Sequence, residues 1–440
     1  MLTTLAVLCV AATAPVSVPF ERYTLPNGLT VILHEDHRLP SVTVNVWMRV
    51  GSSDEAKGRA GFAHLFEHLM FMGTAAVPNG EFDRVMEQAG GTNNATTSED
   101  RTNYFESGPS QLLETFLWLE SDRLAHLADD MTKQKVDLQR EVVKNERRQS
   151  YENRPYGMTN SIILEQIYPA GHPYQHPVIG SHADLSAASV EDVKAFFRKY
   201  YVPANASLVI AGDFKPDDAK ALVAKYFGPL KRVEAPLRVV PPMVELNKPA
   251  RVTRKDKVKA ERVVLAWLTP AAWTKGEPEL DLLAGVLGHG KSARLVKSLV
   301  LDQQLASSVE VRSEALRGPG LFTITATAQQ GHTAAEVEKA LDVELQRLLD
   351  SPPTAAEVER ARALLEVESL SQLEQVFVRA DLLNELESEL GDPALLPYAL
   401  TTRYDDLGSS ELAEVARRVL TRPRVTVTFL PETTKKEGGK

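Results

Sequence analysis

The sequence contains almost no cysteine and no cluster of basic residues. One cysteine, Cys9, occurs in 440 residues, so the chain cannot form an internal disulfide framework. Lys and Arg number 50 against 59 Asp and Glu, which gives a formal net charge of −9, and the basic residues form no long run. This charge pattern counts against binding to nucleic acid. After residue 18 there is no apolar stretch of about eighteen residues, so we expect no later membrane-spanning helix.

Residues 1–17 contain no charged side chain and are mostly apolar or small. They resemble the hydrophobic core of a signal peptide, and Ala12-Thr13-Ala14 resembles a cleavage region. On this interpretation the mature protein is periplasmic or secreted and has lost its only cysteine. The basic residues that usually open a signal peptide are missing, so an apolar N-terminal strand packed on the body of the protein is the alternative, with a cytoplasmic location.

The segment His64-Leu65-Phe66-Glu67-His68 places two imidazoles four residues apart, with a carboxylate beside them. On an α-helix, residues i, i+3 and i+4 lie on the same face. His64 and His68 could therefore bind one zinc ion, and Glu67 could reach the water that completes its coordination. A solvated helix face with these residues by chance is the alternative. Flanking glycines and apolar residues at helical spacing favour a short helix with one buried side: Phe62, Leu65, Phe66, Leu69 and Met70.

A catalytic zinc usually has three protein ligands, and Glu146 is the candidate for the third. It lies in a run from Thr132 to Arg154 that contains neither glycine nor proline and predicts a long helix. The sequence Pro155-Tyr156-Gly157 follows and predicts the end of that helix. An ordinary charged helix without a metal is the alternative.

These segments together resemble the pitrilysin and insulysin family of zinc peptidases, the inverzincins, whose His-x-x-Glu-His motif reverses the commoner His-Glu-x-x-His order. His68 and Glu146 are 78 positions apart (146 − 68), which suits the distal glutamate of that family. The chain is similar to a bacterial two-domain subunit and to the β subunits of mitochondrial processing peptidases. The resemblance covers nearly the whole chain after the first twenty residues, including Gly90–Ser98, Thr102–Phe105, Glu141–Glu146 and Ser150–Gly157.

The resemblance implies one zinc ion per chain, bound by His64, His68 and Glu146, with Glu67 as the general base. A zinc ion makes bound water more acidic and polarises a carbonyl, and a carboxylate can accept the proton of that water and pass it to the leaving amine. One departure is Gln139, because many relatives have an acidic residue seven positions before the third ligand.

The resemblance also implies where a peptide substrate would bind. In the family, an edge strand near the metal takes up the peptide by β-addition, which recognises backbone more than sequence. The matching residues here are Asn94, Ala95 and Thr96. A glycine–asparagine turn before an ordinary strand is the alternative.

The length favours two to three domains, and a proline-rich connector at residues 234–250 divides the chain. Ser41–Val50 alternates strictly and predicts a half-buried strand, while Ala206–Asp213 predicts a buried strand that closes the first half. The second half repeats this plan, with strands expected at Arg262–Leu268 and Arg424–Leu430 and a helix near Leu280–Leu287.

We therefore expect an ancient duplication whose second copy lacks the metal motif. A zinc-bearing peptidase domain is expected at residues 18–233 and a homologous inactive domain at 251–431, followed by a polar, disordered tail at 432–440. The resembled family has the same α+β architecture: two homologous domains, each a mainly antiparallel sheet with helices packed on one face.

Two further patterns compete with this interpretation. Gly285–Ser292 satisfies the phosphate-loop pattern Gly-x4-Gly-Lys-Ser, but Leu280, Leu283 and Leu287 recur at helical spacing before it, whereas a true phosphate loop follows a strand. We therefore expect a glycine-rich turn between helices rather than a nucleotide site. His172 and His176 are also four apart, but prolines follow both of them, so we expect packing and hydrogen-bonding roles.

One feature of the resembled family is missing. Single-chain and homodimeric relatives place an Arg and a Tyr, seven residues apart, opposite the zinc, where they hold substrate and stabilise the oxyanion. The matching positions here are Val300 and Ser307, which cannot do so. We therefore expect the chain to be the zinc-bearing half of a heterodimer whose homologous partner carries the Arg/Tyr pair. There are two alternatives to the heterodimer: the match of Val300 and Ser307 to the Arg/Tyr positions is shifted, or another group of this chain takes the place of that pair.

For the chain as a whole, the rival functions are a non-catalytic scaffold of the same fold and a nucleotide-binding protein.

Overall fold

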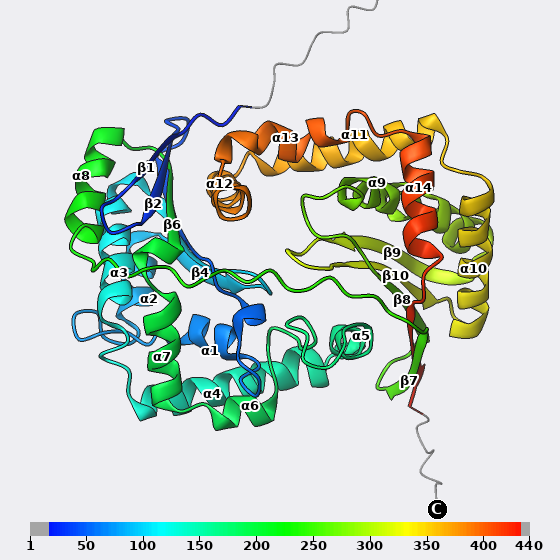
Figure 1. Ribbon diagram of the computed structural model, residues 1–440, viewed down its shortest axis with the longest axis horizontal. Coiled ribbons are helices and arrows are strands. Elements are labelled where there is room, and N and C mark those ends of the chain that lie inside the picture. Colours follow the sequence, from blue (N-terminus) through cyan, green and yellow to red (C-terminus); the bar gives the residue numbers. More distant parts are fainter. Residues whose placement is uncertain (1–16, 433–440) are drawn as a thin grey trace, which may run out of the picture.

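The chain folds into two β-sheets, one in each half of the sequence, which lie on opposite sides of the molecule (Figure 1). The computed structural model describes residues 17–432. The expected signal segment at 1–17 and the tail at 432–440 therefore lie, except for one residue each, outside the described residues. No helix within the described range has both the length and the apolar character needed to cross a membrane.

The two sheets have the same strand order once the first strand is set aside. Strands β2 and β6 are parallel, as are β7 and β11, and every other pair is antiparallel. In spatial order the first sheet contains β1 (Glu21–Thr24), β2 (Thr30–Glu35), β6 (Ala206–Gly212), β3 (Ser41–Met48), β5 (Thr102–Pro109) and β4 (Thr92–Thr97). The second contains β7 (Ala250–Asp256), β11 (Val425–Pro431), β8 (Arg262–Leu268), β10 (Leu321–Ala328) and β9 (Ala306–Glu314). The predicted α+β fold of two mainly antiparallel sheets is confirmed.

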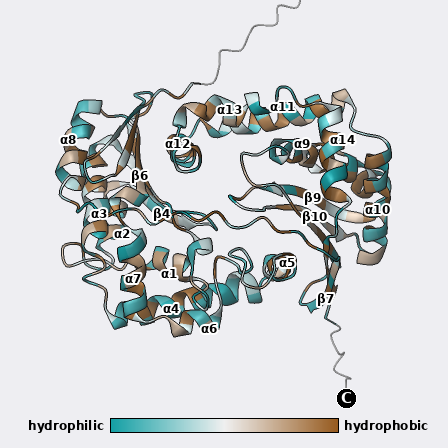
Figure 2. Cartoon of the chain, viewed as in Figure 1, coloured by the Kyte–Doolittle hydropathy of each residue, from teal (hydrophilic) through white to brown (hydrophobic). Residues whose placement is uncertain are grey.

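The helices follow the same repeated plan. One face of the first sheet is covered by helices of its own half, which share one hydrophobic core with it: α1 (Phe62–Leu69), α2 (Glu81–Ala89), α3 (Leu113–His126), α4 (Lys133–Arg147), α6 (His182–Ala187), α7 (Val190–Tyr200) and α8 (Pro216–Phe227). The second sheet is covered in the same way by α9 (Glu277–Gly288), α10 (Ala334–Asp350) and α14 (Ser409–Leu420), with α11 (Ala355–Gln372) outside α9. The apolar strand β6 stands out in Figure 2.

The remaining face of each sheet is covered by a helix from the other half. Helix α12 (Val376–Leu390) packs Leu383 and Leu386 against Ile32 and Val209 of the first sheet. Helix α5 (Thr159–Ile167) packs in turn against strands β8 and β11 of the second sheet. Helix α5 follows the long helix α4 of the first half, and α12 follows the long helix α11 of the second half. The two halves therefore exchange equivalent helices, each of which covers the sheet of the other half, and together they form one packed body.

This exchange corrects the prediction that the strand at Ser41–Val50 is buried on one face only. In β3 every residue after Ser41 is buried, including the polar alternate positions. Asn45 Nδ2 and Trp47 Nε1 each donate a hydrogen bond of 2.9 Å to Asp381 Oδ1 on α12. The polar residues of the alternating pattern therefore bond to a helix from the other half of the chain rather than to water.

The other predicted elements are found close to their expected limits. Helix α4 continues as a π-helical segment, Arg148–Glu152, and so fills the run predicted from Thr132 to Arg154. Residues 234–249 of the connector predicted at 234–250 contain neither helix nor strand, and β7 begins at its last residue. The glycine-rich segment at 285–292 begins inside α9, so a helix precedes it, as predicted, and a phosphate loop is not formed.

We predict that the two halves unfold together, because each completes the core of the other. Leu383→Ala removes a fully buried side chain from the α12 contact and should lower the free energy of unfolding by about 2–5 kcal/mol. Chemical denaturation followed by fluorescence and circular dichroism measures this change. Leu364→Ala, the same substitution at a leucine of α11 that is 41% exposed, is the control. Equal effects of the two substitutions would contradict the role of α12.

Candidate metal centre

Helix α1 presents His64, Glu67 and His68 on the side that faces away from the core. Its opposite side packs into the hydrophobic core of the first half through four buried residues: Phe62, Leu65, Phe66 and Leu69. The helix starts after Gly61, whose φ of +97° favours glycine. A Cβ at this position would also lie 2.8 Å from the carbonyl oxygen of Ile179. The apolar spacing of the helix thus determines which way the two imidazoles and the carboxylate point.

A buried carboxylate fixes the beginning of α1. Glu55 accepts hydrogen bonds from the backbone N–H groups of Gly61 (2.9 Å) and Ala63 (2.7 Å), which have no partner within the helix. Burial raises the pKa of Glu55 well above its ordinary value, although these N–H groups oppose the shift. The sequence gives no sign of this role, because Glu55 reaches the helix from six residues upstream of Gly61, across a loop, rather than from the usual capping position.

The three predicted ligands converge on one point. Glu146, on α4, lies one turn after the buried Val143, which anchors that helix in the core. His64 Nε2 lies 3.8 Å from Glu146 Oε1, and His68 Nε2 lies 3.2 Å from Glu146 Oε2. The three donor atoms all lie within 4.8 Å of one another. Bonds of about 2.0–2.1 Å in a tetrahedral site place donors about 3.4 Å apart, so the residues fit a zinc ion.

The protonation of this cluster also suits a cation. Burial, together with the neighbouring His68, lowers the pKa of His64 to about 4, so its imidazole is neutral near pH 7. A hydrogen bond from His68 lowers the pKa of Glu146, which keeps that carboxylate ionised. A metal ion needs its imidazole and carboxylate ligands deprotonated. His64 and Glu146 are therefore already deprotonated near pH 7, as metal binding requires.

Glu67 lies beside the cluster and is held by the end of an edge strand. Its Oε2 accepts a hydrogen bond from the hydroxyl of Thr97, the last residue of β4. Burial raises the pKa of Glu67 above its ordinary value, which makes the ionised carboxylate a stronger base. No sequence pattern marks Thr97 for this role, although it directly follows the stretch that was proposed to bind substrate.

Asn94, Ala95 and Thr96 lie in β4, at the edge of the first sheet. Among the strands of residues 17–432, β4 pairs with β5 alone, so its other edge is free of any strand. Side chains bond to part of its backbone: Arg101 Nη1 donates to the carbonyl oxygen of Thr96 at 2.9 Å, and the N–H of Ala95 donates to Asn94 Oδ1 at 2.9 Å. Gly90 and Gly91 lie between α2 and β4, so the glycine turn of the alternative is also present, and Asn94 lies in the strand that follows it. The structure therefore brings an edge strand to the metal cluster through Thr97 and Glu67.

A cavity of about 590 Å³ opens next to the metal cluster and is lined by both halves of the chain. Glu146 and Tyr151 line it on the side of the first half, and Arg312 and Thr325 of the second sheet line the opposite side. Such a polar, two-sided space beside the cluster can admit a peptide segment. Arg312 is paired with Glu310 on the same strand.

The positions matched to the missing Arg/Tyr pair lie elsewhere. Val300 is in a π-helical segment, Val296–Asp302, and packs on the hydrophobic core of the second half. Ser307, on β9, donates a hydrogen bond of 3.2 Å to the carbonyl oxygen of Thr327. Neither residue is among the described residues that line the cavity.

Three other candidates from the sequence take structural roles. Gln139 donates its Nε2–H to the sulfur of Met72 at 2.8 Å. His172 stacks on Tyr168 at 4.7 Å between ring centroids and bonds to the carbonyl oxygen of Pro242, which confirms the packing role predicted for it. His176 lies 3.7 Å from Glu55.

Two family matches cover most of the chain. Residues 30–173 match the family described as Insulinase (Peptidase family M16), and residues 187–365 match the Peptidase M16 inactive domain. The four residues of the metal cluster and its neighbouring carboxylate, His64, Glu67, His68 and Glu146, all lie within the first match.

Relatives of similar length carry the word protease in their names. The zinc protease PqqE of Helicobacter pylori is 30% identical over 414 residues, which cover 93% of this chain and 92% of that protein. An uncharacterized zinc protease of Mycobacterium tuberculosis is 28% identical over 94% of this chain and 92% of its own. The crystal structure of a protease from Helicobacter pylori has a TM-score of 0.86 at 29% identity and covers 95% of this chain and 100% of its own.

A larger protein shows the same fold. The periplasmic protease PqqL of Escherichia coli has a TM-score of 0.78 at 18% identity. The match covers 95% of this chain but only 48% of PqqL, so PqqL has the length of about two such units.

Proposed function

This chain belongs to peptidase family M16, the insulinase family, and we propose that it is a zinc-dependent endopeptidase acting on peptides or unfolded polypeptide segments. The observation that carries the proposal is the convergence of His64, His68 and Glu146 at distances that fit zinc, with Glu67 beside them. These three residues would hold the ion. Zinc, when bound, acts as a Lewis acid that makes water more acidic and polarises a carbonyl.

The residues of this chain supply the remaining steps. Glu67, held by Thr97 and partly desolvated, accepts a proton from the attacking water and delivers it to the leaving amine. The free side of β4, at Asn94, Ala95 and Thr96, pairs with the backbone of the substrate and selects extended segments. The cavity lined by Glu146 and the second sheet provides room for the substrate next to the cluster.

The two rival functions have less support. The match described as inactive covers residues 187–365 and contains none of the four cluster residues, so it does not argue for a scaffold role of the first half. A nucleotide-binding role for Gly285–Ser292 lacks its structural premise, because a helix rather than a strand precedes the glycines. The uncharged apolar segment at 1–17 supports a periplasmic or secreted location, with a cytoplasmic one as the alternative.

We also propose that the chain works with a homologous partner that carries the Arg/Tyr pair. The positions matched to that pair, Val300 and Ser307, lie away from the cavity. The Escherichia coli protease PqqL is long enough for two such units, whereas this chain spans about half of it. A second unit facing the cavity would complete the set of groups that act on the carbonyl oxygen.

The metal assignment predicts about one zinc ion per chain in the purified protein, because three protein ligands leave the fourth position open for water. The double substitution His64→Ala/His68→Ala removes two of the three donors and should abolish zinc binding. Atomic emission spectroscopy after dialysis measures the content, and His172→Ala is the matched control at a histidine that stacks on Tyr168. Full zinc occupancy in the double variant would refute the assignment.

Glu67→Gln separates zinc binding from the reaction. The amide has the shape of the carboxylate but cannot accept a proton, so zinc should remain while hydrolysis falls by about 10²–10⁴-fold. Turnover of an unstructured fluorogenic peptide measures this loss, with Glu141→Gln, an exposed residue of the neighbouring helix, as the control. Turnover within a few-fold of the parent would show that Glu67 is not the base.

The partner proposal predicts weak activity of the chain alone and at least a tenfold gain when the homologous chain encoded nearest to it is added. The same peptide assay measures both, and analytical ultracentrifugation detects the complex. The Glu67→Gln chain, mixed with the same partner, checks that the gained activity comes from this subunit. Strong activity of the isolated chain, unchanged by the partner, would reject the proposal.

A further inference from the structure

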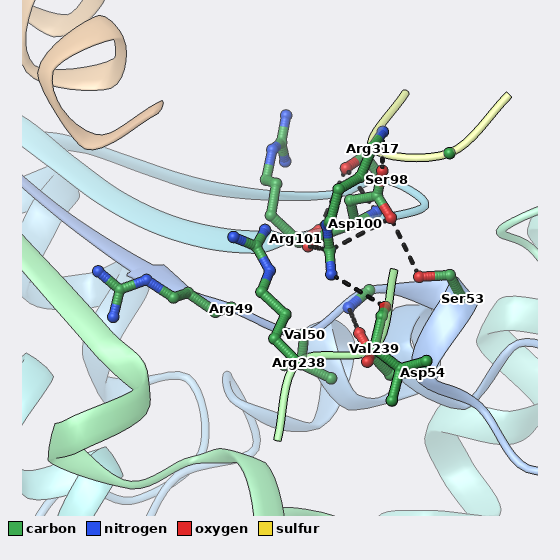
Figure 3. Close-up of polar contacts among 12 residues, drawn as sticks. Arg49, Val50, Ser53, Asp54, Ser98, Asp100, Arg101, Arg238, Val239 and Arg317 are labelled. Atoms are coloured by element: carbon green, nitrogen blue, oxygen red, sulfur yellow. Dashed lines mark hydrogen bonds and ion pairs between the residues drawn. The ribbon is translucent and has the colours of Figure 1, made fainter. Parts of the chain in front are cut away.

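The turn that follows β4 is tied to the second half of the chain by a partly buried arginine. Asp100 lies in the β4–β5 turn, and Arg317 lies in the corresponding β9–β10 turn of the second sheet. The side chains of Asp100 and Arg317 are 11% and 9% exposed. Figure 3 shows the guanidinium of Arg317 reaching the backbone and carboxylate of Asp100.

Several contacts hold this pair. Arg317 Nη2 lies 3.2 Å from Asp100 Oδ1 and donates to the carbonyl oxygen of Asp100 at 3.0 Å. The backbone N–H of Arg317 donates to Asp100 Oδ2 at 3.0 Å. The hydroxyl of Tyr174 donates to Asp100 Oδ2 at 2.8 Å and accepts the N–H of Gly318 at 3.0 Å. A Cβ at Gly318 would lie 2.9 Å from Pro241 and 3.0 Å from Tyr174, so the β9–β10 turn packs closely against the connector and Tyr174.

Two short paths lead from Asp100 to the metal centre. The first path follows the chain: Asp100 lies three residues after Thr97, the last residue of β4, whose hydroxyl bonds to Glu67. The other path runs through the preceding loop, because Ser53 Oγ donates to Asp100 Oδ1 at 3.1 Å and the N–H of Ser53 donates to the carbonyl oxygen of Glu99 at 2.8 Å. Two residues later, Glu55 holds the first turn of α1.

We propose that Arg317 is a positioning residue for the peptidase site: it fixes the β4–β5 turn through Asp100 and thereby aligns Thr97 with Glu67 and the free edge of β4 with the substrate. The proposal rests on the function proposed above. It assigns the second half, which carries none of the zinc ligands, a direct part in the geometry of the first. A buried, charge-assisted contact of an arginine with both the backbone and the side chain of its partner suits this task.

Amide hydrogen exchange tests the positioning directly and does not depend on turnover. In zinc-loaded protein, Arg317→Ala should speed the exchange of residues 92–101 by at least tenfold, with the zinc content unchanged. Arg294→Ala is the control, because Arg294 makes a partly buried ion pair with Glu357 inside the second half, far from the turn in sequence. Unchanged exchange in Arg317→Ala, or equal changes in both variants, would overturn the proposal.

Peptide hydrolysis tests the consequence for the reaction. In Arg317→Ala, kcat/KM should fall at least tenfold. KM should rise because β4, which binds the substrate, is less ordered, and kcat should fall because Glu67 is displaced. Arg317→Lys keeps the charge and should recover part of the loss, while Arg294→Ala should change neither constant. Asp100→Asn should act in the same direction, and the double variant should be no worse than the worse single variant, because the two residues act as one unit.

The outcomes separate this proposal from the proposed function. A parent protein that stays inactive even with the homologous partner added would count against the peptidase assignment, while the exchange data would still decide whether Arg317 orders the turn. Faster exchange with unchanged kcat and KM would reject the positioning role and leave a purely structural contact. Additive losses in the double variant would reject the coupling between Arg317 and Asp100.

Discussion

The reciprocal covering of the two sheets by α5 and α12 is the constraint on which the rest of the structure depends. Each sheet has an apolar face filled by its own helices and a second face that needs a cover. Because that cover comes from the other half, neither half has a complete core alone. The exchange fixes the distance between the sheets and so creates the space between Glu146 and the second sheet. The candidate site is therefore a property of the whole chain, although its ligands come from one half.

Within that frame, the site follows from the packing of two helices. The apolar sides of α1 and α4 enter the same core, which turns their polar sides toward each other. Two imidazoles one turn apart on α1 and a carboxylate on α4 then meet without any strand or loop having to supply a ligand. The surrounding groups adjust this arrangement: Glu55 holds the start of α1, and Thr97 orients Glu67. Rigid elements of this kind keep donors within the narrow tolerance that a metal site needs.

The sequence was sufficient for features that depend on local spacing. The interval of four between His64 and His68, the uninterrupted run around Glu146 and the apolar strands near Arg262 and Val425 predict elements that the structure contains. Features that depend on distant partners were not predictable. Asn45 and Trp47 look solvent-facing in the alternating pattern because nothing local reveals Asp381, more than 300 residues away, as their hydrogen-bond acceptor.

The same limit applies around the site. Glu55, Thr97, Asp100 and Arg317 carry no spacing pattern that would distinguish them from ordinary polar residues of loops and strand ends. Their roles arise from contacts across turns and between halves, which periodicity does not encode. Family resemblance singled out the candidate ligands because it compares whole segments, but it gave no information about how the second half contacts the turn after β4.

The repeated plan of the two halves explains why the candidate metal cluster forms in one of them. Helices α9 and α11 are the counterparts of α1 and α4 in chain order and in their position beside the sheet. In the second half this pair packs closely through Leu282, Val286, Val358 and Ala361. Gly285 permits that contact, since a Cβ there would lie 3.0 Å from the Cβ of Ala361.

The glycines that imitate a phosphate loop are thus explained by packing. Gly285 faces α11, and a Cβ at Gly288 would lie 2.7 Å from Val311 of β9, so both positions require close approach rather than an anion. In the first half the equivalent surface between the two helices carries His64, His68 and Glu146 instead of apolar side chains. A polar surface there leaves space for an ion, whereas the apolar surface in the second half closes it. The same helix pair therefore forms a candidate metal centre in one copy and a hydrophobic core in the other.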